Sequence, residues 1–195
     1  IDVTPGGKDS GYMNVNATRT GYYLAKFMNT VADFLKPLEE QDSRHYNPML
    51  RKAEVWLNFA EASNEAFGPK VVGPGCTKSA YDVIKIIREK SGGITDVTYL
   101  DEMAASKETF RTLIQNERRI EFAFENQRFW DLRRWLLPLN EPIYGMRVTR
   151  DGSGDDVFEV VKVEDRPLND VRYYYMPLPY LEVQKNPKLI NNKGW

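Results

Sequence analysis

The spacing of apolar side chains predicts a chain built mostly from amphipathic helices. Between Ser106 and Glu125, apolar and charged residues recur on a 3.6-residue period, which is typical of one long helix. The side chains that fall near one face are Phe110, Leu113, Ile114, Glu117, Glu121, Phe124 and Arg128. Asn126 tolerates the left-handed conformation that ends helices, so we expect a break there and a second short helix through Trp135, before Pro138.

Two earlier segments, Met49–Phe67 and Ser79–Lys90, show the same periodicity. We expect the first to direct inward Leu50, Ala53, Trp56, Leu57, Ala60 and Phe67, and the second Tyr81, Ile84 and Ile87. Gly68-Pro69 would end the first segment, and Ser91-Gly92-Gly93 would end the second. A pair of antiparallel helices is the unit of tetratricopeptide repeats, although these residues match that repeat only loosely.

The C-terminal third alternates short apolar runs with turn residues, which favours strands and turns. Residues 151–156, with the sequence DGSGDD, read as a hairpin tip between strands Ile143–Thr149 and Val157–Val163. This acidic loop lacks the ligand spacing of an EF-hand, so we expect no calcium site. A short helical piece is predicted at Tyr180–Gln184, and Thr20–Phe27 suits a half-buried strand or extended segment.

Charge and composition exclude several classes of function. Lys and Arg total 27 against 28 Asp and Glu, so the chain lacks the basic excess typical of proteins that bind nucleic acid or anionic membrane surfaces. No apolar run approaches the roughly 20 residues of a membrane-spanning helix. Cys76 is the only cysteine and His45 the only histidine, so neither an internal disulfide nor a zinc site of several such ligands is expected. Aromatic residues make up 12% and could serve core, interface or sugar stacking.

The acidic residues of the long helix could in principle be catalytic or metal-binding groups. A di-iron site would need Glu-x-x-His motifs, and a glycosidase needs two carboxylates facing each other across a cleft. Arginines alternate with these acids, so a structural ion-pair network explains them better. Its predicted members are Glu117, Arg118, Glu121, Glu125, Arg128, Asp131, Arg133 and Arg134. We therefore expect a protein that is not an enzyme and holds no metal or cofactor.

Several motifs in order along the chain closely resemble the SusD/RagB family, the outer-membrane nutrient-binding lipoproteins of Bacteroidetes. The matching segments are TGYYLAKF at 20–27, RKAEVWLNFAEA at 51–62, ERRIEFAFE at 117–125, RFWDLRRW at 128–135, MPLP at 176–179, and the ending from Asn186-Pro187 to Gly194-Trp195. The tail departs from the usual family ending at Ile190, Lys193 and Trp195.

The resemblance implies a mainly α, SusD-like fold with tetratricopeptide-type helix pairs, irregular loops and a small β-hairpin. It also implies that residues 1–195 are the C-terminal part of one SusD/RagB-like domain, whose N-terminal portion and lipoprotein signal are missing. By the same resemblance, the parent protein is lipid-anchored in the outer membrane, at the cell surface.

The function implied by the resemblance is binding of an oligosaccharide, or in some relatives a peptide, for uptake through a partner, a SusC-like TonB-dependent transporter. The alternative is a helical-repeat scaffold for protein–protein contact that binds no ligand of its own. Loop position and chemistry alone nominate Tyr12, Asn14, Asn16 and Arg19 as ligand-binding residues; a plain surface loop would have the same composition.

Overall fold

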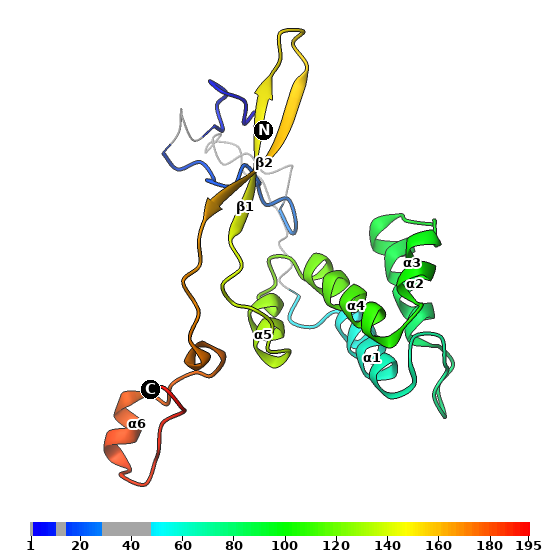
Figure 1. The fold of residues 1–195 in the computed structure, drawn as a ribbon, viewed down its shortest axis with the longest axis vertical. Helices are drawn as coiled ribbons and strands as arrows, with labels where there is room; N and C mark the ends of the chain where they lie inside the picture. Colours follow the sequence, from blue (N-terminus) through cyan, green and yellow to red (C-terminus); the bar gives the residue numbers. More distant parts are fainter. Residues whose placement is uncertain (1, 11–14, 29–47) are drawn as a thin grey trace, which may run out of the picture. The chain divides into compact units, whose positions relative to one another are not determined.

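The computed structural model of the chain describes residues 2–10, 15–28 and 48–195, and helices supply most of its regular structure (Figure 1). The elements in chain order are α1 (Lys52–Phe67), α2 (Ala80–Gly92), α3 (Thr98–Met103), α4 (Lys107–Glu121), α5 (Gln127–Arg134), β1 (Ile143–Arg150), β2 (Asp156–Glu164), the 3-10 helix η1 (Val171–Tyr174) and α6 (Tyr180–Lys185). They fall into two compact units, Val31–Trp130 and the combination of Ile1–Thr30 with Asp131–Trp195. His45 lies outside the described residues.

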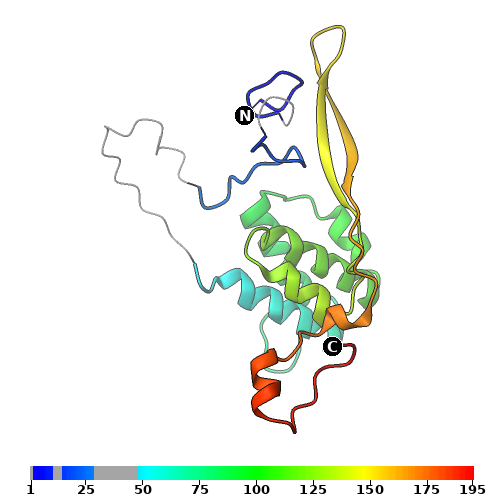
Figure 2. The same cartoon turned by 90° about the vertical axis from the view of Figure 1, so that its left-hand side faces the viewer.

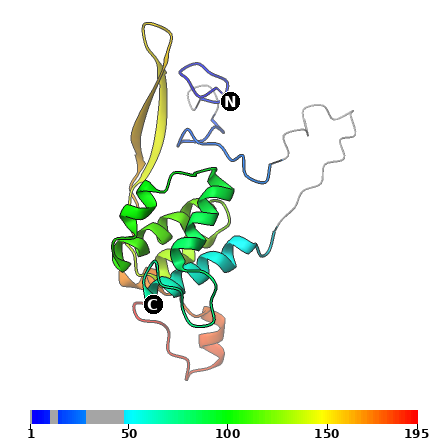
Figure 3. The same ribbon diagram turned by 90° about the vertical axis from the view of Figure 1, so that its right-hand side faces the viewer.

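Helices α1 to α4 form the core of the first unit, and they gather side by side in Figure 3, coloured cyan to green. Their buried apolar residues are Leu57, Ala60, Ala80, Val83, Ile84, Ile87, Leu100, Ala104, Phe110, Leu113 and Ile114, joined by Phe122 just after α4. The predicted helices are confirmed. Most of these buried side chains are ones that the 3.6-residue period placed on the inward face of a helix.

Side-chain caps fix where two of these helices begin. The Ser79 hydroxyl accepts from the backbone N–H of Asp82, and the Asp82 carboxylate accepts from the backbone N–H of Ser79. Ser106 and Thr109 make the corresponding reciprocal pair at the start of α4. These capping boxes satisfy donors that the first turn of a helix leaves unpaired. Asn126 has φ 63°, as predicted for the break before α5.

The ends of the helices differ from prediction in ways that expose some apolar residues. Helix α4 ends at Glu121, so Phe124, also at positive φ, is 69% exposed and does not join the buried face. Helix α1 begins at Lys52 because Arg51 is extended, which leaves Leu50 78% exposed instead of buried. Phe67, in the last turn of α1, is also exposed. The sequence patterns did not predict the short helices α3 and η1.

The predicted hairpin is confirmed almost to the residue. Strands β1 and β2 pair antiparallel, with Val148 opposite Phe158, and Figure 2 shows them as a long two-stranded ribbon. At the tip, the Asp151 carboxylate accepts from the backbone N–H groups of Ser153 and Asp155 at 2.8 and 3.0 Å. The acidic loop thus uses its first carboxylate to hold its own turn.

The segment Thr20–Phe27 forms no strand, contrary to one of the two alternatives predicted for it. Its contact with the hairpin includes one backbone hydrogen bond, from Met146 N–H to the Thr20 carbonyl at 2.8 Å. Gly21, at φ 72°, turns the chain directly after this bond. In the described part of the chain, no helix combines the length and the apolar character needed to cross a membrane.

Candidate functional site

A pocket of about 610 Å³ lies between the N-terminal segment and the hairpin, within one compact unit. The residues that line it are Val3, Pro5, Asp9, Ser10, Thr18, Arg19, Gly21, Met146, Arg147, Val148, Thr149 and Val161. This volume is within the range of about 300–1,000 Å³ that small-molecule sites occupy. The lining mixes apolar side chains with hydroxyl, carboxylate and guanidinium groups, so it can both cover a ligand and orient it.

Two glycines allow the N-terminal segment to lie against strand β1. A Cβ atom on Gly21 would stand 2.2 Å from the Met146 carbonyl oxygen, and one on Gly145 would stand 2.6 Å from the Thr20 carbonyl oxygen. Any larger residue would push the two backbones apart and break the hydrogen bond between Met146 and Thr20. These glycines therefore set the edge of the pocket.

The opposite wall is a loop that hydrogen-bonds to itself. The Asp2 carboxylate accepts from the hydroxyl and the backbone N–H of Thr4, at 2.6 and 3.2 Å, and these bonds lower the pKa of Asp2. The Asp9 carboxylate accepts from the backbone N–H of Asp2 at 2.7 Å. The Tyr23 hydroxyl donates to the Asp9 carbonyl at 2.7 Å, which ties the loop to the following segment.

Three polar side chains of the pocket, Arg19, Arg147 and Ser10, are held weakly or lack a partner among the described residues. Arg19 pairs with Glu164 at 3.0 Å and Arg147 with Glu159 at 3.4 Å, and all four side chains are more than half exposed. Ser10 is only 3% exposed, and its hydroxyl has no hydrogen-bond partner among the described residues. A buried hydroxyl without a partner is uncommon, because losing water without replacement costs free energy.

Of the four residues that the sequence nominated for ligand contact, one lines the pocket. Arg19 lines the pocket, whereas Asn16 is exposed and is not among the lining residues. Tyr12 and Asn14 lie outside the described residues. Sequence reasoning missed Ser10 and Arg147; the hairpin was predicted, but nothing in the sequence indicated that it would face the N-terminal segment.

A second polar cluster lies in the helical unit and centres on Arg51. Its guanidinium donates two hydrogen bonds to the Glu125 carboxylate, at 2.8 and 2.7 Å, and one to the Glu121 carboxylate at 2.8 Å. A fourth bond reaches the Glu121 carbonyl at 3.0 Å. The Glu125 carboxylate is the main cause of the raised pKa of Arg51. This arrangement joins the start of α1 to the end of α4.

Other acids of the long motif also meet arginines. Arg88 of α2 pairs with Glu117 at 2.5 Å, and Arg134 pairs with Asp131 at 2.8 Å. Arg118, predicted to join an ion pair, donates to the amide oxygen of Asn58 at 2.7 Å. The remaining predicted members, Arg128 and Arg133, each make at least one hydrogen-bonding, electrostatic or ring interaction.

Arg51 and Arg88 were not predicted as partners, because neither lies in the segment that carries these acids. Both come from other elements, the start of α1 and helix α2, and meet α4 only when the helices pack. With these guanidiniums bound, Glu117, Glu121 and Glu125 are placed to hold helices together.

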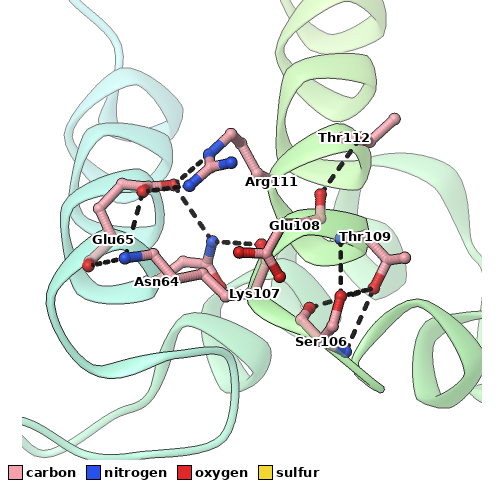
Figure 4. Close-up of polar contacts among 8 residues, drawn as sticks. All are labelled: Asn64, Glu65, Ser106, Lys107, Glu108, Thr109, Arg111 and Thr112. Carbon is pink, nitrogen blue, oxygen red and sulfur yellow. Dashed lines mark hydrogen bonds and ion pairs between the residues drawn. The ribbon is translucent and has the colours of Figure 1, made fainter.

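A third cluster joins the end of α1 to the start of α4 (Figure 4). Arg111 donates two bonds of 2.7 Å to the Glu65 carboxylate, which lower the pKa of Glu65. The buried Asn64 amide donates to the Lys107 carbonyl at 3.0 Å, and the Lys107 ammonium donates to the Glu65 carbonyl. These contacts are also structural, since they connect two helices of one core.

Metal-binding side chains do not gather in the chain as far as the structure describes it. No group of three or more His, Cys, Asp and Glu residues there is placed to hold a metal ion. Cys76 is an exposed free thiol.

Comparison with known proteins assigns the chain to a family. The model of the SusD family matches residues 2–195. The chain belongs to this family. Among curated relatives, SusD-like protein P2 of Formosa agariphila is 31% identical over 161 residues, and SusD-like protein P25 of the same organism is 29% identical over 175 residues. These alignments cover 80% and 87% of this chain.

A solved structure supports the SusD-like fold. The crystal structure of a SusD-like protein from Bacteroides fragilis matches with a TM-score of 0.56 and 37% identity, covering 75% of this chain. This chain spans about a quarter of the length of these SusD relatives, 27% of each curated protein and 25% of the solved chain. The mainly helical, SusD-like fold predicted from the motifs is confirmed.

Proposed function

We propose that the protein carrying these residues binds a nutrient, an oligosaccharide or a peptide, at the cell surface and passes it to a SusC-like TonB-dependent transporter. The observation that carries this proposal is the match to the SusD family across residues 2–195. The pocket beside β1 supports it, because its size and mixed lining suit a small polar ligand. Arg19 is the predicted ligand residue that we carry forward.

The proposed role is capture without catalysis. Glu117, Glu121 and Glu125 accept hydrogen bonds from guanidinium groups, and the side chains of all three are at most 15% exposed. A carboxylate used as a general acid or nucleophile must reach a substrate, which these positions do not favour. The family resemblance points the same way.

The proposed location is the outer face of the outer membrane, through a lipid anchor. We expect the native protein in the outer-membrane fraction, labelled by a biotin reagent that does not cross membranes when intact cells are treated. Incorporation of a palmitate analogue would test the anchor. Recovery of the unlabelled protein from the cytoplasmic fraction would contradict this proposal.

Binding and partnership are tested together on the full-length protein. Affinity purification from outer membranes is expected to recover a TonB-dependent transporter, and a glycan and peptide array is expected to give at least one saturable ligand. A transporter without any ligand would instead favour the alternative, a helical scaffold that only contacts other proteins. If neither a transporter nor a ligand is recovered, the proposed function is overturned.

A further inference from the structure

The pocket between the N-terminal segment and β1 combines two guanidinium groups with hydroxyl groups and an apolar surface. From this combination we propose that it binds a saccharide that carries an acidic group, a carboxylate or a sulfate. The proposal rests on the proposed function, ligand capture, and specifies the ligand at this pocket. None of the described residues that line it is aromatic, so a sugar here would be held by charge and hydrogen bonds more than by ring stacking.

The guanidinium groups of Arg19 and Arg147 can change partners at little cost. Their side chains are 73% and 55% exposed, and the Glu164 and Glu159 side chains that they pair with are also more than half exposed. Water screens such surface pairs, so each contributes little to stability. A guanidinium fork binds a carboxylate or sulfate with two parallel N–H bonds, which gives an acidic ligand a geometric advantage.

The positive charges of the described lining are the two guanidinium groups. Arg19 and Arg147 supply two positive charges and Asp9 one negative charge. The Asp9 carboxylate already accepts the backbone N–H of Asp2 at 2.7 Å, so it serves the loop that forms the wall. An acidic ligand group would bind the arginines by displacing Glu164 and Glu159, the exposed carboxylates that pair with them.

The hydroxyl groups favour a sugar over a simple carboxylic acid. Ser10 is almost fully buried, and its hydroxyl lacks a partner in the described structure. A sugar hydroxyl beside it would supply the missing hydrogen bond. Thr149 adds a further hydroxyl, whereas the Thr18 hydroxyl already bonds Thr20 at 2.9 Å. Val148 is among the apolar residues that can cover the C–H surface of a sugar ring.

The test is isothermal titration calorimetry on the full-length protein with four probes. Two are acidic, tetragalacturonic acid and a sulfated carrageenan tetrasaccharide; the neutral reference is β-1,4-galactotetraose, and trialanine supplies a peptide carboxylate. We expect at least one acidic saccharide to bind about tenfold or more tightly than the neutral one, as hydrogen bonds to a charged group would give. The two acidic probes distinguish a carboxylate from a sulfate.

Three variants place the binding in this pocket. Arg19→Gln and Arg147→Gln are each expected to weaken the acidic saccharide about tenfold, and Ser10→Ala to weaken it about threefold. The matched control is Arg150→Gln: Arg150 lies on the same strand in an exposed ion pair with Asp156 but does not line the pocket. It should bind as the parent does, and unchanged thermal melting would show that all four variants fold.

Several results would overturn the proposal. If the neutral saccharide binds as tightly as the acidic ones, the ligand does not need an acidic group. If only trialanine binds tightly, the ligand is not a saccharide. If neither acidic probe binds, the pocket does not hold an acidic saccharide. The same conclusion follows if the Arg19 and Arg147 variants lose no more affinity than the Arg150 control. If glycan binding persists in these variants, the pocket proposal fails but the proposed capture function does not. The proposed function fails only if the unmutated protein binds no glycan, peptide or transporter.

Discussion

Arg51 stabilises the packing of α1 against α4, although its position before α1 does not indicate this role. It lies just outside α1, yet its guanidinium makes four hydrogen bonds with Glu121 and Glu125, 70 or more residues away. Its side chain is 23% exposed and those of its two partners 14% and 15%, so water screens these pairs only in part. Removing the cation would leave two carboxylates facing each other in this environment.

We therefore predict that Arg51→Ala lowers the free energy of unfolding by about 2–3 kcal/mol, somewhat less than the loss for a fully buried pair because some water reaches this one. Urea denaturation followed by circular dichroism measures the change. Arg119→Ala is the matched control, since Arg119 is an exposed arginine of α4, and its free energy of unfolding should stay near that of the unmutated protein. Equal free energies of unfolding for the two variants would count against the role of Arg51.

Gly21 is the second residue whose importance depends on tertiary contact. Its φ of 72° disfavours other residues, and a Cβ atom there would collide with the Met146 carbonyl oxygen. We predict that Gly21→Ala costs about 1–3 kcal/mol and speeds hydrogen exchange at the Met146 N–H, which bonds Thr20. Gly152→Ala, at a glycine with open space around it, should change neither quantity. Unchanged exchange at Met146 in the Gly21 variant would contradict the close contact.

At the scale of elements, the helices were predictable because local patterns and caps agree. Apolar positions of α2 and α4 repeat on the helical period, and Ser79 and Ser106 cap their first turns. The ends were less predictable: α4 stops at Glu121, where Phe122 turns into the core, and the helical period could not show this. The hairpin followed from its glycine-containing acidic turn between two short apolar runs.

The cap of α2 makes a testable link between this element and pH. Hydrogen bonds from the Ser79 backbone and hydroxyl lower the pKa of Asp82 below its ordinary value of 3.8. A carboxyl with a depressed pKa in the folded state stabilises the fold above the unfolded-state pKa, and this contribution is lost as pH falls through the folded-state pKa. The affected window therefore lies below about pH 4.

We predict that Asp82→Ala is less stable than the parent at neutral pH and that this difference shrinks as pH falls below about 4. Chemical denaturation at a series of pH values measures the two curves. A difference that stays constant across the series would show that the charge of Asp82 does not contribute to the cap.

At the scale of the whole molecule, membership of the SusD family and the ion pairs of α4 both favour binding without chemistry. We predict that the full-length protein leaves an oligosaccharide ligand intact during long incubation, as measured by chromatography of the recovered sugar. Shorter products that increase with protein concentration, in a preparation free of added hydrolase, would contradict this prediction.

The sequence by itself determined the approximate positions of the longer helices, the hairpin and the family, because periodicity, turn residues and ordered motifs are local along the chain. It also marked Arg19 as a candidate ligand residue from loop chemistry. Tertiary structure decided the rest: Arg51 and Arg88 meet the α4 acids only when helices pack, and Ser10 and Arg147 share a pocket only when the N-terminal segment lies against β1. Such contacts join residues far apart in sequence, so no local pattern carries them.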